Sequence, residues 1–328
     1  WALPGALWQL RPEACGLLTA LNEQVWRSGD PVLLELVRVR VAQLIGNPAA
    51  VRDRCALAGT GVEAKLAALP DYPSSPLFSS AERDVVSLAE QFVIDVGGTT
   101  EDMRAELTGG FGADGARELV TAIYVVEFTQ RLQLIAARLL GDAVAAPSGS
   151  VAAPADSLAA AADSLAAADA SPAGLLDAYQ AAVVRGSTLD PVTTELVRLR
   201  CARTHHCRIC QPQRLAGARA AGVDEDMTAK VDFYERSDLP ERAKVALRVT
   251  DAFITRPDLL SDAVGGQARA SFGPGELASL SLDITKWSTQ KIKVALGTDG
   301  ADRLVTDADG VALFGFDSEG QAAGFRRR

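Results

Sequence analysis

The feature that most constrains the fold of this chain is an internal duplication. The segment Glu-Leu-Val-Arg-Val-Arg at 35–40 recurs 160 residues later, at 195–200, as Glu-Leu-Val-Arg-Leu-Arg. Other residues match at the same shift, namely Asp30, Pro31 and Arg54 with Asp190, Pro191 and Arg214. This period is too long for a solenoid, whose repeats are ~20–50 residues. The pattern therefore predicts two copies of one domain.

The composition between and after the copies predicts the domain boundaries. We expect a first domain at 1–141, a linker at 142–172, a second domain at 173–298 and a tail at 299–328. The linker is rich in Ala, Ser and Asp and has few large apolar groups, so we expect a tether. In the tail, 311–314 has the composition of a short strand. The Asp residues of the tail lack the full pattern of a calcium loop, so we expect no metal there.

Each copy is expected to be helical, which makes the predicted fold class all-α. Hydrophobic residues make up 48% of the chain and aromatic residues 5%, which favours helices over a β-sandwich. Asp190 followed by Pro191 is a typical helix start. In the helix that follows, Arg198 is expected to point away from the apolar face. No strand is expected within either copy, and the longer helices are predicted at 80–95, 115–140, 240–255 and 275–296.

Charge and cysteine content exclude several classes of protein. The net charge is −9, so nucleic acid is not the expected partner. The absence of a run of 18 apolar residues predicts no membrane-spanning helix. Arg11 and Glu13 interrupt the apolar part of a would-be signal peptide, although a leader before Trp1 is left open. Five cysteines with one close pair do not suggest a secreted disulfide scaffold, so we expect a reducing cytoplasm.

The close cysteine pair, Cys207-x-x-Cys210, is the strongest candidate site. Cys207 matches Asn47 of the first copy, and Asn47 precedes Pro48, which is a helix-start signal. We therefore expect Cys207 at the N-cap of a helix and Cys210 in its first turn, with Pro212 tolerated there. A helix start lowers the pKa of a thiol.

The side chains around this pair have more than one interpretation. Arg208, His205 and His206 would favour the thiolate, and two thiols at this spacing can form a disulfide. Alternatively, both cysteines are apolar fillers of the core. A metal site is disfavoured, because adjacent His206 and Cys207 rarely point at one ion, and no metal is predicted. Glu195 is equally compatible with catalysis and with an ion pair to Arg198.

Glu195, eleven further residues and then Cys207-x-x-Cys210 resemble the alkylhydroperoxidase D and carboxymuconolactone decarboxylase superfamily. The segments 195–200 and 70–82 are also similar to that superfamily. The resemblance implies an all-helical fold assembled as a homo-oligomer, either a trimer or a hexamer. It also implies reduction of a small hydroperoxide by the thiol pair, a Glu–His proton relay, and a dihydrolipoyl or thioredoxin-like dithiol reductant. It implies no cofactor.

The resemblance carries over to some site residues and not to others. Glu195, Cys207 and Cys210 match the relay glutamate and the cysteine pair, with Cys210 as the thiol that attacks peroxide. The position of the relay histidine holds Arg214, which is no base at neutral pH but would stabilise a thiolate by its charge. His205 or His206 would then transfer the proton.

The first copy holds Asn47 and Ala50 at the cysteine positions, so we expect it to be a scaffold. The expected function of the whole chain is that of a thiol-dependent peroxidase or disulfide reductase. Two alternatives stay open. One is a catalytically degenerate member with an assembly or redox-sensing role, and the other is a lyase similar to carboxymuconolactone decarboxylase.

Overall fold

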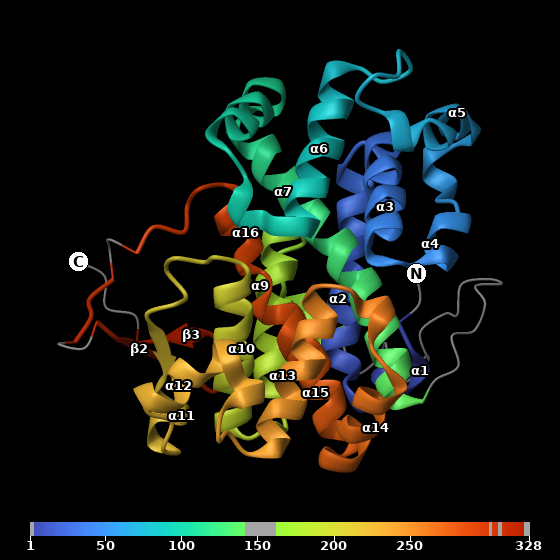
Figure 1. Cartoon of the computed structure of the whole chain (residues 1–328). Coiled ribbons are helices and arrows are strands. Elements are labelled where there is room, and N and C mark those ends of the chain that lie inside the picture. Colours follow the sequence, from blue (N-terminus) through green and yellow to red (C-terminus); the bar gives the residue numbers. More distant parts are fainter. Residues whose placement is uncertain (1–2, 142–161, 302–303, 308–309, 325–328) are drawn as a thin grey trace.

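A computed structural model of the chain describes residues 3–141, 162–301, 304–307 and 310–324 (Figure 1). The first half is built from helices joined by short 3₁₀ turns. Its elements in chain order are α1 (Gly5–Leu10), α2 (Pro12–Ser28), α3 (Pro31–Ile45), α4 (Pro48–Arg52), η1 (Ala56–Ala58), η2 (Thr60–Val62), α5 (Glu63–Ala67), η3 (Leu69–Asp71), α6 (Ser80–Asp95), η4 (Val96–Gly98) and α7 (Glu101–Leu140).

The second half is also helical and ends in a small sheet. Its helices are α9 (Pro172–Arg185), α10 (Pro191–Thr204), α11 (Ala216–Ala220), α12 (Glu225–Ala229), η5 (Lys230–Arg236), α13 (Glu241–Ile254), η6 (Pro257–Leu259), α14 (Asp262–Ser271), α15 (Pro274–Trp287) and α16 (Gln290–Ala295). The strands are β1 (Gln213–Leu215), β2 (Ala312–Phe316) and β3 (Ala322–Ala323). The prediction of an all-α class is confirmed.

The ends of the predicted helices follow from local capping chemistry. Asp190 caps α10 by accepting the backbone N–H of Thr193, and Ser79 caps α6 in a reciprocal capping box with Glu82. The helix predicted at 115–140 is longer, because α7 begins at Glu101 and bends at Gly112, where φ is +70°. The helix predicted at 275–296 is divided into α15 and α16.

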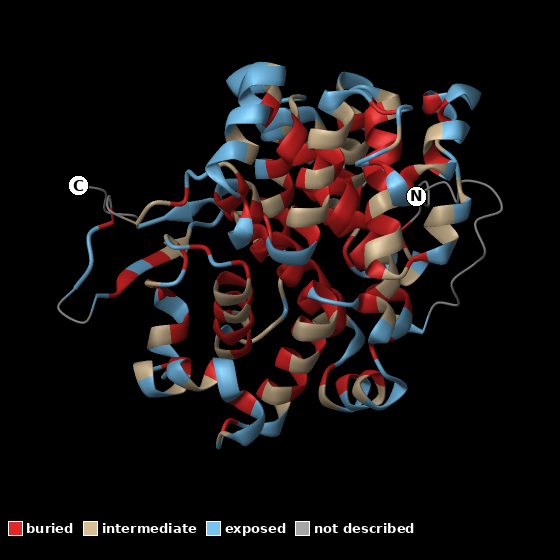
Figure 2. Ribbon diagram, turned by 45° about the horizontal axis from the view of Figure 1, so that its top comes forward, coloured by how far each residue is buried: buried red, intermediate tan, exposed pale blue. Residues whose placement is uncertain are grey.

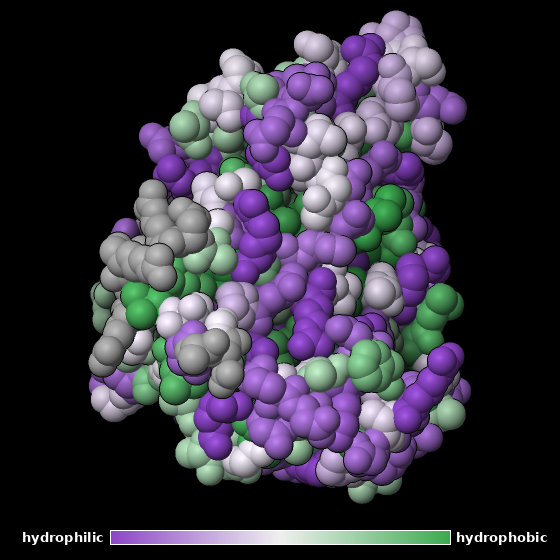
Figure 3. All heavy atoms as spheres, turned by 60° about the vertical axis from the view of Figure 1, so that its left-hand side comes forward, coloured by the Kyte–Doolittle hydropathy of each residue, from purple (hydrophilic) through white to green (hydrophobic). Residues whose placement is uncertain are grey.

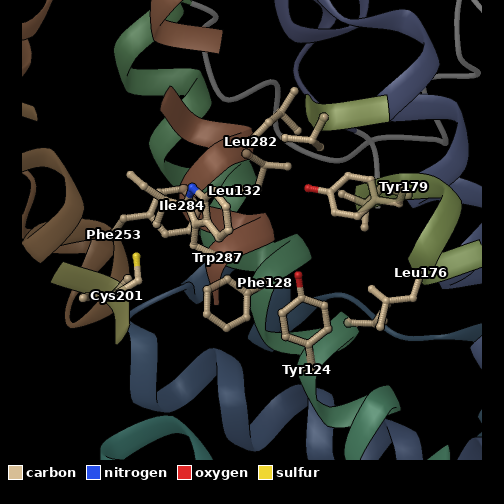
Figure 4. Packing of buried hydrophobic residues seen from close by; sticks show 14 of the residues in the cluster. Tyr124, Phe128, Leu132, Leu176, Tyr179, Cys201, Phe253, Leu282, Ile284 and Trp287 are labelled. Carbon is tan, nitrogen blue, oxygen red and sulfur yellow. The ribbon is translucent and has the colours of Figure 1, made fainter. Parts of the chain in front are cut away.

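Both halves share one hydrophobic core. Within the halves, α3 packs on α6 and α7, and α10 packs on α13 and α15; between them, α2 packs on α9 and α7 packs on α15. Figure 4 shows Tyr124, Phe128 and Leu132 of α7 beside Leu282 and Ile284 of α15. In Figure 2 the buried residues form a continuous band across these central helices. The order of elements is alike in the two halves, which supports the duplication, although the duplication itself stays a prediction.

The length and composition of α7 alone would allow it to cross a membrane. In the folded chain, 89% of its most apolar window is buried inside the protein. Burial of this kind is what a core helix shows, so α7 gives only weak support for a membrane span.

The tail packs against the second half. Its strand β2 pairs in parallel with β1, with Arg214 opposite Leu313, and in antiparallel with β3. The strand predicted at 311–314 is therefore confirmed within one or two residues. The expectation of no strand within either copy is wrong at 213–215, because β1 forms only by pairing with a segment about 100 residues away, which local sequence does not reveal.

The predicted linker is described only in part. Residues 142–161 lie outside the described residues, and 162–167 are helical. Pro172, the last residue of the predicted linker, already begins α9, because Ser171 caps that helix through the N–H of Gly174.

Candidate functional site

The two cysteines of the candidate site are joined to each other. Cys207 and Cys210 form a disulfide with an S–S distance of 2.07 Å and a Cα–Cα distance of 5.3 Å. The structure thus brings together the two sulfurs that the sequence singled out. Both side chains are buried, Cys207 completely and Cys210 with 4% of its surface exposed.

The expectation that an α-helix begins at Cys207 is wrong. The helix α10 ends at Thr204, and the chain then reverses through His206, whose φ is +55°. One turn follows, in which the N–H groups of Cys210 and Gln211 both donate to the carbonyl oxygen of Cys207. The chain does not continue as a helix, because Pro212 has no N–H to donate and its ring disfavours a helical conformation at Gln211. Asn47 in the first half does cap α4, so the two halves differ here.

Glu195 and Arg198 hold the segment that contains Cys210. Nε and Nη2 of Arg198 donate to the two carboxylate oxygens of Glu195, each at 2.7 Å. Nη1 donates at 2.9 Å to the carbonyl oxygen of Cys210, and Nη2 also donates to that of Gln213. Glu195 additionally accepts the N–H of Leu215 at 3.4 Å.

Arg198 does point away from the apolar face that contains Leu196 and Leu199, but the side of the helix on which it lies is covered as well. Its residue surface is 3% exposed, because the 207–213 segment and Phe314 of the tail cover it. The guanidinium is compatible with burial since its donors meet a carboxylate and two carbonyl oxygens. One of the two interpretations of Glu195 is an ion pair with Arg198. The structure contains this ion pair, but it is buried and not on the helix surface.

The same arrangement occurs in the first half at a shift of 160 residues. Arg38 makes a bidentate ion pair with Glu35, with N–O distances of 2.7 and 2.6 Å. Arg38 also donates to the carbonyl oxygens of Ala50 and Asp53, which match Cys210 and Gln213. The buried Glu–Arg pair thus anchors a loop in both halves, with or without cysteines.

The two histidines lie in different environments. His205 is buried, and its Nε2 lies 3.0 Å from the hydroxyl oxygen of Ser288. Burial, with the nearby charges of Lys291 and Arg131, lowers the pKa of His205 well below its usual value, so the ring is neutral at physiological pH. His206 is exposed, and its Nε2 lies 3.9 Å from Asp95 of the first half.

Arg214 and Arg208 are held by carboxylates. Arg214 lies in β1, not on a shared helix face with the cysteines, and it donates to Glu225 at 2.7 and 3.2 Å. Arg208 donates through its backbone N–H and its guanidinium to Asp299, which is 2% exposed. These contacts fix the loop on both sides of Cys210. Whether either arginine acts on the thiols stays a prediction.

A cavity of about 240 Å³ lies against Cys210. It is bordered by Arg198 and Ile209 on one side, by Lys286 and Trp287 of α15 on another, and by residues of β2 and β3. The sequence interpretation missed Lys286, because an isolated lysine in an apolar helix has no motif. Burial lowers the pKa of Lys286 and raises that of Asp283, one turn earlier on α15.

Among the residues that the structure describes, no group of three or more His, Cys, Asp or Glu side chains is arranged to hold a metal ion. The groups that the structure does bring together at this site are the two sulfurs, the buried Glu195–Arg198 pair and the charged or polar side chains around the cavity.

Comparisons with known proteins identify the family of this chain. The model of the carboxymuconolactone decarboxylase family matches residues 172–231, a segment that contains Glu195, Cys207 and Cys210. Proteins from two strains of Mycobacterium tuberculosis, each described as uncharacterised, are 32% identical over 272 residues. That alignment covers 81% of this chain and 90% of each relative. No solved structure matches the chain. The chain therefore belongs to the carboxymuconolactone decarboxylase family, within the alkylhydroperoxidase D-like superfamily.

Proposed function

We propose that the protein is a thiol-dependent peroxidase or disulfide reductase in which Cys207 and Cys210 cycle between dithiol and disulfide. The observation that carries this proposal is that the two sulfurs lie within bonding distance while Cys210 borders a cavity. A thiol that meets a substrate needs such an opening, and a partner thiol one turn away can resolve its oxidised form before further oxidation.

The proposed reaction balances with a hydroperoxide and a dithiol. The thiolate of Cys210 attacks one peroxide oxygen, so that an S–O bond forms as the O–O bond breaks. The alcohol leaves after taking up a proton. The thiol of Cys207 then displaces water from the sulfenic acid on Cys210, which forms the disulfide. A dihydrolipoyl or thioredoxin-like dithiol supplies two electrons and two protons to restore both thiols, and becomes a disulfide itself.

The other predicted site residues have proposed roles around this pair. Glu195 is proposed as the proton relay, and its bidentate pair with Arg198 supports a positioning role for the Cys210 segment as well. The neutral ring of His205 has a nitrogen suited to proton transfer, and the exposed His206 faces solvent. Arg214 is proposed to act by its charge. We further propose that the protein works in the cytoplasm as a homo-oligomer.

The test is consumption of cumene hydroperoxide with a dithiol reductant. We expect the Cys207→Ser, Cys210→Ser double variant to fall to the uncatalysed rate, because no sulfur can accept the oxygen. Cys55→Ser is the matched control, since Cys55 is a free cysteine of the first half. Equal rates for wild type and the double variant would exclude the proposal. Turnover of a cyclic lactone acid after thiol blocking would instead support the lyase alternative.

A further inference from the structure

Lys286 is a buried ammonium whose hydrogen-bonding capacity the protein does not use. Its residue surface is 4% exposed. An ammonium carries three N–H donors, yet among the described residues no carboxylate lies within ion-pair distance of Nζ and no oxygen accepts a hydrogen bond from it. Its neighbours are aromatic faces: Nζ lies 3.2 Å from the centroid of the Trp287 ring and 4.5 Å from that of Phe316.

Such an arrangement stabilises a cation, but none of the described residues supplies an acceptor for its N–H groups. A cation–π contact attracts the ammonium to an aromatic ring but provides no oxygen that accepts its N–H hydrogen bonds. A buried charge is costly unless it is both paired with an opposite charge and hydrogen-bonded. Lys286 also borders the cavity that contains Cys210. The missing acceptor therefore has room on the cavity side.

The rest of the cavity wall has the character of a small amphipathic site. Trp287, Phe314 and Phe316 supply apolar faces, and polar side chains such as Gln180 and Gln290 border the same cavity. The volume is below the ~300–1,000 Å³ usual for drug-sized ligands, which suits a ligand about the size of a substituted benzene. Figure 3 shows the face on which the C-terminal strands lie, where hydrophilic residues surround small groups of hydrophobic ones.

We propose that this cavity binds an organic hydroperoxide that carries a carboxylate, with the carboxylate on Lys286 Nζ, the apolar body against Trp287, Phe314 and Phe316, and the peroxide at Cys210. The hydroperoxide part rests on the proposed function, whereas the anion site stands on the contacts of Lys286. The lowered pKa of Lys286 agrees with an ammonium that lacks an anion, and a bound carboxylate would raise that pKa.

The first test separates the anion site from the thiol chemistry by using a ligand that has no peroxide. We expect 4-isopropylbenzoate to bind in isothermal titration calorimetry and isopropylbenzene to bind at least tenfold more weakly. Lys286→Met should lose about 10- to 100-fold in affinity for the acid, the usual range for a hydrogen bond to a charged group. Lys286→Arg should recover part of it.

The matched control is Lys244→Met, which removes a lysine of α13 that does not border the cavity. Far-UV circular dichroism shows whether each variant is folded. Equal affinity of wild type and folded Lys286→Met for the acid, no binding of the acid to wild type, or equal binding of the acid and the neutral hydrocarbon would each overturn the proposal.

The pH profile of binding gives an independent measure. The acid is ionised above pH ~6, so a fall in affinity with rising pH reports loss of the proton from Lys286. We expect its midpoint below the ordinary lysine pKa of ~10.4, because burial lowers it. The other charged groups facing it are Asp283 of α15 and Arg198 of α10, with Asp177 of α9 and Lys293 of α16 on the same cavity. An affinity that does not change up to pH ~10 would contradict the assignment to Lys286.

A second experiment distinguishes the failure of this proposal from that of the proposed function. Turnover of cumene hydroperoxide is compared with turnover of the same hydroperoxide carrying a carboxylate group on its benzene ring. If the carboxylate binds Lys286, the carboxylated hydroperoxide has a lower KM than cumene hydroperoxide in wild type, and the two KM values become similar in Lys286→Met. If both peroxides turn over with equal KM, the anion site is wrong while the peroxidase stands. If 4-isopropylbenzoate binds through Lys286 and neither peroxide is reduced, the anion site stands and the peroxidase fails.

Discussion

At the scale of single residues, the structure is organised by buried charges that hold loops. Arg198 joins the carboxylate of Glu195 to the carbonyl oxygen of Cys210, and Arg38 makes the equivalent contacts in the first half. Removing one partner of a buried ion pair leaves an uncompensated charge, which is more costly than the pair itself is favourable. The Glu195–Arg198 pair lies beside the disulfide and the Glu35–Arg38 pair does not. Comparing variants of the two pairs therefore separates a purely structural role from a role in thiol chemistry.

We expect Glu195→Gln and Glu35→Gln each to lower the free energy of unfolding by about 3–5 kcal/mol, because each leaves a buried guanidinium without its carboxylate. Urea unfolding measures this loss. Only Glu195→Gln should also speed alkylation of the reduced Cys207 and Cys210, since Arg198 donates to the carbonyl oxygen of Cys210 whereas Arg38 holds a different loop. The same acceleration in Glu35→Gln would show that the effect is general loosening rather than local anchoring.

At the scale of elements, the tail is a structural part of the second half. The strand β2 pairs with β1, the backbone N–H of Ala312 donates to the carbonyl oxygen of Pro212, and Phe314 lies against Arg198. The turn between β2 and β3 packs on α9, and Gly320 in that turn has a φ of +75°. Any Cβ at Gly320 would collide with the carbonyl oxygen of Ala181.

Gly320→Ala should therefore release the β2–β3 hairpin from α9. We expect hydrogen exchange of the Ala312 amide to become about 10- to 100-fold faster, which corresponds to a local cost of ~1–3 kcal/mol. Gly310→Ala is the matched control, because Gly310 has nearly the same φ, +76°, but open space around it. If both variants exchange equally, backbone strain and not the contact with α9 determines the opening.

At the scale of the whole molecule, buried charges also join the two halves. Glu127 of α7 accepts from Arg131 at 2.8 Å and from Lys291 of α16 at 2.7 and 2.9 Å. Arg131 in turn donates to the carbonyl oxygen of Phe253, at the end of α13. Together with the shared core of α7 and α15, this cluster predicts that the halves unfold as one unit.

We expect one unfolding transition in urea, with the same midpoint by far-UV circular dichroism and by tryptophan fluorescence, since Trp8 and Trp26 report the first half and Trp287 the second. Glu127→Gln should lower the free energy of unfolding by at least ~3 kcal/mol, because it leaves two buried cations together. Lys291→Met should cost less, since Arg131 still pairs with Glu127. Two separated transitions in wild type would contradict this coupling.

The sequence predicts the helices of this protein better than it predicts the arrangement of the candidate site. The helix starts at Asp30, Ser79 and Asp190 are readable, because capping depends on a few neighbouring residues. The closeness of Cys207 and Cys210 is also local, since the two cysteines are three positions apart in one turn. The helix expected after Cys207 is not formed. The expectation is based on the equivalent Asn47, which does cap a helix, but Pro212 prevents the chain after Cys207 from continuing as a helix.

The sequence by itself determined the helical class, the family resemblance and the paired cysteines, since periodicity, caps and short spacings act within a few residues. Only the tertiary structure decided that Arg198 is buried, that the tail completes a sheet with the segment after Cys210, and that Lys286 borders the same cavity as that cysteine. The last two facts depend on contacts between residues more than 70 positions apart, and the burial of Arg198 depends in part on Phe314 of the tail. Burial and charge pairing at that range are properties of the packed chain, and no local pattern encodes them.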